Sequence, residues 1–411
     1  MAGPRPAPRA ATLRKFVHPS TGDVIDNGIA LWFPAPASFT GEDIAELQLH
    51  GGRAVVKAVL TALAEIPGCR MAEPGEFARR AFENGRIDLA EAEGLADLIE
   101  AETEGQRRQA LRQASGTLSA LYEGWRRTLI DATALVEASI DFSDEGDVGI
   151  RAFDQAHGVV SALSQSIRRH LDDGHGGEIL RNGFQVVLAG PPNVGKSSLL
   201  NALARRDVAI VSEEPGTTRD ILEVHLDLDG FPVVIMDTAG IRESVGIVES
   251  EGIRRALARA ESVDLVIWLM DAAGTIEEPP PGFRDRADRM LRVVNKVDLL
   301  PEGIPPRLEA GSIAISVKTG IGLPELTRRL AGIAAERIGP NEDPVITQTR
   351  HRQLIEACAE SLSDFLSQEP SQVELRAEDL RRGAHALGRV TGRVDVEDVL
   401  DQVFKRFCIG K

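Results

Sequence analysis

The spacing of hydrophobic residues changes along the 411-residue chain. Between residues 23 and 52, short apolar runs alternate with turn residues, which predicts the strands of a small α/β unit. Arg53 to Leu63 follows with the spacing of a helix. From about Ile87 to about Arg181, large apolar residues recur at helical intervals, which predicts a helical bundle segment. An acidic stretch that contains glycine, Ser143 to Gly149, is expected to interrupt these helices as a linker.

A different pattern begins at Gly183. Apolar strand candidates then alternate with helical segments as far as about Ala335, and this alternation predicts a mostly parallel, doubly wound sheet. After Pro344 the pattern is helical again to the end of the chain. The strand candidates are Phe184–Ala189, Ile221–Leu228, Phe231–Met236, Asp264–Met270, Leu291–Val294 and Ile313–Ser316.

These patterns predict an α/β plus all-α protein. A doubly wound nucleotide-binding domain, residues 183–341, is expected to be inserted into one helical domain formed by residues 85–182 and 342–411. A small α/β domain, residues 1–84, precedes them.

Composition and charge restrict the possible partners. The formal net charge is −16, so the protein has no overall basic field, and a polyanion must bind at a local patch. The cysteines, Cys69, Cys358 and Cys408, are far apart and form no C-x-x-C pair, which favours a reducing compartment, and we expect the cytoplasm. The longest strongly apolar run, Val263 to Met270, is too short to span a membrane, and no membrane partner is expected.

The predicted strand Phe184–Ala189 leads into GPPNVGKSS, which fits the phosphate-binding pattern G-x-x-x-x-G-K-[ST]. Glycines at its ends allow backbone N–H groups to face phosphate oxygens. Lys196 offers a positive charge to the terminal phosphates, and the Ser197 hydroxyl can ligate magnesium. The nucleotide contacts predicted in this loop are Asn193, Val194, Gly195, Lys196, Ser197 and Ser198.

Further motifs follow in the order that a GTP site requires. Thr218 lies in a loop where it could cover the terminal phosphate and complete the magnesium shell, and Asp237 ends a strand where it could hold magnesium through water. The Asp298 carboxylate can accept two hydrogen bonds from guanine, whereas adenine has no matching pair of donors, so this residue predicts GTP rather than ATP. Each motif alone is also typical of an ordinary turn, but together they predict a GTP-binding domain. Its further contacts are expected at Thr218, Asp237, Thr238, Ala239, Gly240, Asn295, Lys296, Asp298, Ser316, Val317 and Lys318.

GTPases of the Ras type orient the attacking water with a Gln after D-x-x-G, but here Ile241 follows Gly240. With this substitution the chain resembles the MnmE (TrmE) family of tRNA modification GTPases. The resemblance is carried by GPPNVGKSSLLNAL, SEEPGTTRD, DTAGIRE and the C-terminal FCIGK, and in the first domain by SFTGED, ELQLHGG and EPGEF. It spans almost the whole chain and implies a Ras-like G domain inserted into a helical bundle, after a tetrahydrofolate-binding and dimerisation domain.

The family resemblance implies a potassium-activated GTPase whose G domains pair face to face. Glu249 would orient or activate water, although from the sequence alone it is equally an exposed carboxylate at a helix start. Asn193 alone is likewise ambiguous, because it also suits a turn. The implied metal ligands are Asn193, Ser212, Glu214 and Thr217 for potassium and Ser197 and Thr218 for magnesium; Glu213, Pro215 and Gly216 complete the same nucleotide-binding loop.

For the first domain, the resemblance implies binding of 5-formyl- or 5,10-methylene-tetrahydrofolate. Glu46 would contact the pterin edge, Arg86 would lie near the folate where the family more often has Lys, and the C-terminal Lys411 would lie beside it. Without the family, Glu46 reads as a solvated strand residue and Arg86 as a surface charge. Compared with the family, the chain is expected to lack the first N-terminal strand and glycine-rich loop.

Cys408 is a candidate catalytic residue. Lys405, Arg406 and Lys411 surround it in the sequence and favour its thiolate form, which suits a role in the modification chemistry. The alternative is an inert thiol at a packed helix end. Cys69 and Cys358 have no catalytic neighbours in the sequence and are expected to be structural.

The function implied by the resemblance is addition of a carboxymethylaminomethyl or aminomethyl group to the wobble uridine of certain tRNAs. The protein would act as a homodimer with the flavin-dependent partner MnmG (GidA), as a heterotetramer. Two alternatives remain open. One is a GTPase switch of the Era or EngA type, which regulates ribosome assembly, and the other is a paralogue that hydrolyses GTP but has lost folate binding.

Overall fold

The computed structural model describes residues 1–141, 147–172, 175–206, 208–210, 223–237, 263–274, 279, 289–301, 311–339, 344–369, 372–394 and 397–407. The chain forms two compact units. Unit 1 consists of Met1–Ile99, Gln113–Arg127 and Ala384–Lys411, and unit 2 consists of Glu100–Arg112 and Thr128–Gly383.

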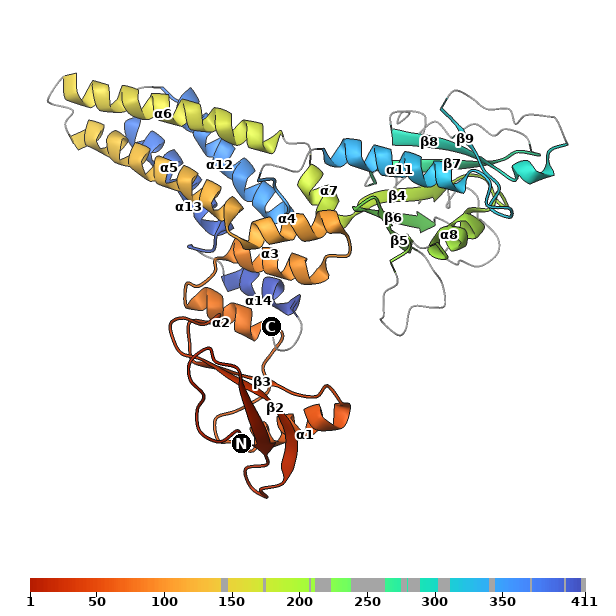
Figure 1. Ribbon diagram of the computed structural model, residues 1–411. Coiled ribbons are helices and arrows are strands. Elements are labelled where there is room, and N and C mark those ends of the chain that lie inside the picture. The colour runs from red at the N-terminus through yellow and green to blue at the C-terminus, as the bar shows by residue number, and fades with distance from the viewer. Residues whose placement is uncertain are drawn as a thin grey trace, which may run out of the picture. The chain divides into compact units, whose positions relative to one another are not determined.

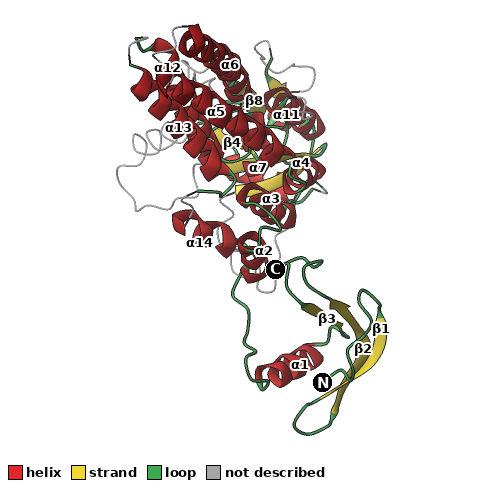
Figure 2. Cartoon of the chain, turned by 90° about the vertical axis from the view of Figure 1, so that its left-hand side faces the viewer, coloured by secondary structure: helices red, strands yellow, loops and turns green. Residues whose placement is uncertain are grey.

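Unit 1 begins with an antiparallel sheet in the order β1 (Thr12–Val17), β2 (Val24–Phe33) and β3 (Ile44–Gln48). The helix α1 (Arg53–Ala64) follows, as the sequence predicts. Figure 2 shows these strands in yellow and α1 in red, in the same part of the picture as the N-terminus.

Three helices of unit 1 share a hydrophobic core. It joins α2 (Glu76–Glu83), α3 (Leu89–Glu100) and α14 (Glu397–Lys405) through apolar side chains that include Ala78, Leu89 and Phe404. Gly75 precedes α2 with φ of 69°, and a Cβ there would lie 2.3 Å from the Phe404 carbonyl oxygen. The glycine is therefore required both by its left-handed backbone and by the close approach of α14.

The helical part of unit 2 is a bundle. Its helices α6 (Asp147–Leu171) and α12 (Thr349–Ser367) pack along each other, and α13 (Val373–Val390) adds Arg376, whose guanidinium lies over the rings of Phe153 and Phe365. The long helix α5 (Thr117–Asp141) and the helix α4 (Glu104–Ala114) each belong to both units, because the boundary between the units crosses them. The expected linker Ser143–Gly149 is wrong at its end, because α6 already begins at Asp147; residues 142–146 lie outside the described residues.

Within the described residues, unit 2 also contains a six-stranded sheet in the order β5-β6-β4-β7-β8-β9 (Figure 1). Neighbouring strands are parallel except β5 and β6, which form an antiparallel hairpin. The mostly parallel doubly wound sheet predicted from the sequence is confirmed. The strands are β4 (Phe184–Ala189), β5 (Glu223–Leu228), β6 (Phe231–Asp237), β7 (Leu265–Asp271), β8 (Met290–Asn295) and β9 (Ile313–Ala314).

The position of each strand in the sheet explains its composition. The central strand β4 is buried on both faces and is almost wholly apolar, whereas the edge strand β5 alternates buried residues with exposed or half-buried ones. The helices α8 (Lys196–Ala204) and α11 (Leu323–Ile338) supply Leu199, Leu326 and Leu330 to the sheet's core. Strand β9 is shorter than the predicted Ile313–Ser316. The Ile315 N–H still donates to the Val294 carbonyl of β8 at 2.7 Å, but the Ser316 N–H donates to the Ile321 carbonyl in the loop before α11.

The N-terminal half of α4 is fastened to the sheet domain. The Gly105 N–H donates to the Gly230 carbonyl at the tip of the β5–β6 hairpin, at 3.1 Å. The side-chain amides of Gln106 and Gln109 donate to carbonyl oxygens of Arg181 and Gly177, in and beside the short helix α7 (Gly176–Asn182) that leads into β4. These bonds join the helical segment to the nucleotide-binding fold within unit 2.

Candidate nucleotide-binding site

The carboxyl ends of four strands meet at one edge of the sheet. The parallel register places Leu188 opposite Asp237, and Asp271 opposite Asn295. In open α/β sheets, ligands bind at this edge, beyond the carboxyl ends of the strands. The predicted nucleotide-binding residues on β6, on β8 and after β4 are thus brought to the same edge.

Two glycines shape the loop between β4 and α8. Gly190 has φ of 141°, and a Cβ there would lie 2.2 Å from the Leu269 carbonyl oxygen. Gly195 has φ of 103° directly before α8, and a Cβ would lie 2.5 Å from the Asn295 amide nitrogen. Both positions combine a left-handed backbone with contacts that leave no room for a side chain, which is why the phosphate-loop pattern needs glycine there.

Lys196 lies inside this loop. Its ammonium group donates to the carbonyl oxygens of Gly190 and Pro191, at 2.9 and 2.8 Å. Burial lowers the pKa of Lys196 from its usual value, and the nearby charge of Asp237 opposes that shift. The cation is therefore held at the loop and is only partly compensated by the protein, which suits a lysine that binds an anion.

Ser197, an expected magnesium ligand, is in contact with Asp237, which is expected to hold magnesium through water; the other expected ligand, Thr218, lies outside the described residues. The Ser197 hydroxyl donates to a carboxylate oxygen of Asp237 at 2.7 Å. Hydroxyl and carboxylate oxygens are the donors that Mg²⁺ prefers, and this ion normally keeps several waters and contacts the nucleotide phosphates. The pair fits a magnesium site, although the described residues contain no cluster of three His, Cys, Asp or Glu side chains that could hold a metal.

Asn295 joins the end of β8 to two loops. Its side-chain N–H donates to the Val194 carbonyl at 2.8 Å, and its side-chain oxygen accepts from the Val317 N–H at 3.2 Å. The residue is almost fully buried, so both ends of the amide are used for structure. Asn295 therefore positions the phosphate loop relative to the Ser316–Lys318 segment.

Lys296 fixes the loop at Asn193. This lysine has φ of 64°, and its ammonium group donates to the Asn193 carbonyl at 2.8 Å and to the Asp271 carboxylate at 2.6 Å. Asn193 is itself left-handed, with φ of 61°, and is exposed, as is Ser198. Lys296 thus fixes the backbone of Asn193, while the Asn193 residue itself stays exposed to solvent.

Asp271 is a site residue that sequence reasoning missed. Burial raises its pKa, but the hydrogen bonds from Lys296 and from the Ala273 N–H together with the charge of Lys296 outweigh burial, so the pKa is lowered overall. The signal available in the sequence was an acidic residue directly after the apolar strand β7.

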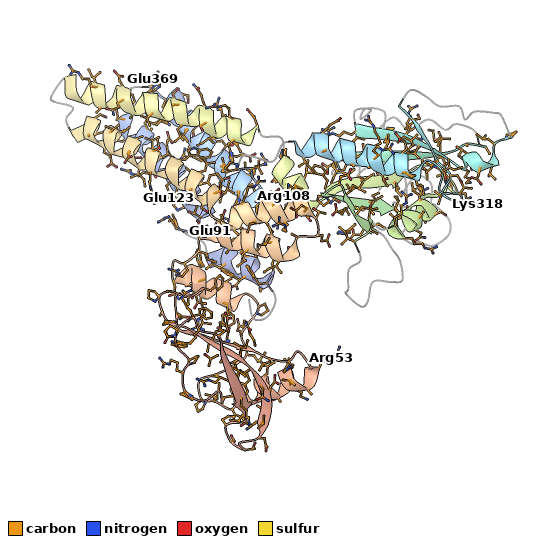
Figure 3. All side chains as sticks on the ribbon, viewed as in Figure 1. Arg53, Glu91, Arg108, Glu123, Lys318 and Glu369 are labelled. Carbon is orange, nitrogen blue, oxygen red and sulfur yellow. The ribbon has the colours of Figure 1, made fainter. Side chains whose placement is uncertain are left out.

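Asp298 is held by a hydroxyl on the neighbouring segment. The Ser316 Oγ donates to one carboxylate oxygen of Asp298 at 2.6 Å, and the same Oγ accepts from the Thr319 N–H. The sequence predicts Ser316 only as a nucleotide contact, and the bond that its fully buried side chain forms with Asp298 is an addition. Lys318, which is labelled in Figure 3, is exposed.

The remaining predicted residues divide into two groups. Glu46 on β3 and Arg86 after α2 lie in unit 1 and are exposed, and the described residues show no ion pair at either side chain. Arg86 lies across Gly41, where a Cβ would be 3.1 Å from its Cγ. The predictions for Ser212, Glu213, Glu214, Pro215, Gly216, Thr217, Thr218, Thr238, Ala239, Gly240, Glu249, Cys408 and Lys411 lie outside the described residues.

The two described cysteines differ. Burial raises the pKa of Cys358 to about 12, which makes its thiol inert and agrees with a structural role. Cys69 is a free, exposed thiol, so packing does not explain it.

Comparison with known proteins identifies relatives over the whole chain. A family model described as "MnmE helical domain" matches residues 89–408, and one described as "GTP-binding protein TrmE N-terminus" matches residues 1–86. The chain is 53% identical to the tRNA modification GTPase MnmE of Parvibaculum lavamentivorans, over 98% of this chain and 91% of that protein. It is 54% identical to the protein of the same name from Maricaulis maris, over 99% of this chain and 92% of that one.

Among solved structures, the G domain of the FeoB iron transporter of T. maritima is 25% identical over 36% of this chain and 98% of that one, with a TM-score of 0.25. No helix among the described residues is long and apolar enough to cross a membrane.

Proposed function

The chain belongs to the MnmE family of tRNA modification GTPases, and from this premise we propose that it is a GTP hydrolase activated by potassium when two of its G domains pair. GTP hydrolysis would time the modification of the wobble uridine by opening and closing the paired domains.

The observation that carries the potassium proposal is the fixed position of Asn193. Lys296 holds its carbonyl, its φ of 61° sets the direction of the residue, and the residue is exposed at the phosphate loop. An amide oxygen is a suitable hard ligand for an alkali cation. Potassium at that place would neutralise phosphate charge, as an arginine finger does in other GTPases.

The other residues would have distinct tasks at this site. Lys196 would bind the terminal phosphates, and Ser197 with Asp237 would hold magnesium, which supplies charge neutralisation between the phosphates. Asp298, oriented by Ser316, would accept hydrogen bonds from guanine. Ile241 stands where Ras-type GTPases have the Gln that orients the attacking water, and its apolar side chain cannot do so. Glu249 would orient the water instead.

The modification itself would need further components. We propose a homodimer that works with the flavin-dependent partner MnmG and adds a carboxymethylaminomethyl or aminomethyl group to tRNA. Glu46, Arg86 and Lys411 would hold a formyl- or methylene-tetrahydrofolate as one-carbon donor, and Cys408 would take part in the chemistry. The cysteine pattern supports the reducing cytoplasm as the place of action.

The test is steady-state GTP hydrolysis in potassium chloride and in equimolar sodium chloride. We expect the wild-type rate to be at least about tenfold higher in potassium, because charge neutralisation at the phosphates is a large part of catalysis in GTPases. The stimulation should be lost in Asn193→Ala. Asn201→Ala, an exposed asparagine on α8 outside the site, is the matched control and should keep it.

Equal rates in both salts would contradict the potassium proposal, whereas the regulatory switch of the Era or EngA type is already disfavoured by the family to which the chain belongs. Potassium stimulation without any folate binding would instead favour the paralogue that has lost the one-carbon donor.

A further inference from the structure

Three arginines of unit 1 surround a single carboxylate. Glu123 on α5, labelled in Figure 3, lies 3.6 Å from Arg126, 3.5 Å from Arg127 and 3.1 Å from Arg393, which follows α13. The Glu123 side chain is 15% exposed, whereas those of Arg127 and Arg393 are 73% and 57% exposed. We call these four residues the Glu123 cluster.

The contacts in the Glu123 cluster are loose. Two of its three nitrogen–oxygen distances exceed the usual range of a hydrogen bond, and Glu123 Oε2 has no hydrogen-bond partner despite the third. Arg126 Nε is buried over Gly388, 3.3 Å from where a Cβ would be, and also has no hydrogen-bond partner. The guanidinium donors of this cluster therefore remain largely available.

Two exposed arginines elsewhere in the described residues, Arg108 and Arg381, are paired more tightly. Arg108 donates to Glu104 at 2.7 Å, and Arg381 donates to Glu137 at 2.6 Å and to Glu378 at 3.1 Å. Charge-assisted hydrogen bonds of about 2.7 Å, such as those to Glu104 and Glu137, are the strong ones. The arginines of the Glu123 cluster differ from these because they share one carboxylate and form no such bond with it.

The charge of the cluster stands out against that of the protein. Three guanidinium groups and one carboxylate leave two positive charges in close contact, in a chain whose net charge is −16. Guanidinium groups that share one carboxylate repel each other, and an added anion with several acceptor oxygens would relieve this repulsion and accept hydrogen bonds from the exposed donors. Phosphate has this chemistry, and planar guanidinium groups match its geometry.

We propose that Arg126, Arg127 and Arg393 form a surface that binds backbone phosphates of tRNA. The inference rests on the family's action on tRNA and not on potassium activation. A protein with this net acidity can bind RNA only through local positive surfaces, and this cluster is one that carries excess charge and free donors. Such phosphate contacts would position the tRNA without reading its sequence.

The test is tRNA affinity of the full-length protein as a function of sodium chloride concentration. The double variant Arg127→Glu/Arg393→Glu should bind at least about tenfold more weakly, and the slope of log affinity against log salt should fall by about 2, one for each lost phosphate contact. Glu123→Gln should bind tRNA more tightly, because it removes the one negative charge of the cluster.

The matched control is Arg108→Glu/Arg381→Glu, whose side chains are 70% and 54% exposed. It makes the same charge change at arginines that are already paired, so the salt slope should stay at the wild-type value. The thermal unfolding midpoint of each variant checks its fold, and Arg127→Gln/Arg393→Gln replaces the reversal if that variant does not fold.

The proposal is overturned if wild type does not bind tRNA, if both double variants bind alike, or if Glu123→Gln weakens binding. Loss of a protein partner with unchanged tRNA affinity would also overturn it and would assign the cluster to an acidic protein surface. Because every arm uses sodium chloride, these outcomes do not depend on whether potassium activates GTP hydrolysis.

Discussion

Single side chains at the nucleotide site act mainly by fixing other parts of it. Asn295 is buried, and its side-chain amide forms hydrogen bonds with the backbone of Val194 and of Val317. The ammonium group of Lys296 forms hydrogen bonds with the Asn193 carbonyl and the Asp271 carboxylate. A motif residue that reads as a ligand contact in the sequence thus also has a structural task. Substitution of Asn295 would displace the phosphate loop as well as the Ser316–Lys318 segment, and substitution of Lys296 would release the phosphate loop at Asn193.

Asp298 offers a sharp test of nucleotide specificity. In Asp298→Asn, an amide N–H₂ replaces one acceptor oxygen, so guanine loses an acceptor for its own amino group, whereas xanthine presents a carbonyl oxygen there. We expect GTP affinity to fall by roughly 10²-fold or more and xanthosine triphosphate affinity to rise. Titration with both nucleotides measures this change.

The control for this substitution is Asp229→Asn in the β5–β6 turn, away from the site, which should leave both affinities at the wild-type values. If Asp298→Asn weakened both nucleotides equally, the carboxylate would serve the structure through Ser316 rather than the base.

The contact between Ser197 and Asp237 is of the kind that local patterns can anticipate, because strand–loop–helix motifs carry their own geometry. It did not predict Asp271 or the hydroxyl of Ser316. Their partners, Lys296 and Asp298, are separated from them in the chain and meet them only through the register of β7 with β8 and the loop after β9. Such contacts depend on tertiary pairing, which local patterns do not contain.

Elements were predicted best where their periodicity is strong. Strands β4 and β8 and helix α1 are found close to their expected bounds, because long apolar runs and helical spacing leave few alternatives. Helix α2 was missed because it is short and has few apolar residues, and its packing comes from α14 at the far end of the chain. The start of α6 was missed because glycine and acidic residues resemble a linker.

The contact between α4 and the β5–β6 hairpin gives a prediction at the scale of elements. A Cβ at Gly105 would lie 2.6 Å from the Gly230 carbonyl oxygen and 3.0 Å from Leu180. Gly105→Ala should therefore destabilise the protein by about 1–3 kcal/mol, as overpacking does, although alanine favours helices. Urea unfolding, with the signal of unit 2 followed, measures the change.

The matched control is Gly158→Ala in α6, where a Cβ meets nothing within 4 Å. Here only helix propensity changes, and the variant should gain about 0.5–1 kcal/mol. Equal effects of the two substitutions would mean that α4 does not hold the hairpin tightly in solution.

At the scale of the whole molecule, the chain combines a nucleotide-binding fold in unit 2 with a separate small sheet in unit 1. Family membership makes this combination intelligible, because an enzyme of tRNA modification needs chemistry that a GTPase domain does not contain. The sequence suggested the three-part order of the chain, but its patterns could not show that α4, α5 and α13 each span the boundary between the units.

Folate binding is the prediction that decides what unit 1 contributes. Glu46 and Arg86 are exposed and show no ion pair among the described residues, so neither charge is committed to the fold. The full-length protein should bind 5-formyl-tetrahydrofolate in equilibrium dialysis, and Arg86→Ala should weaken binding about 10–100-fold, as loss of a charge-assisted hydrogen bond does. Glu46→Gln should weaken it as well, because the amide replaces an acceptor oxygen with a donor.

Arg53→Ala on α1, another exposed arginine of unit 1, is the control and should bind like wild type. A wild-type chain that hydrolyses GTP but binds no folate would instead be the paralogue that lost the one-carbon donor.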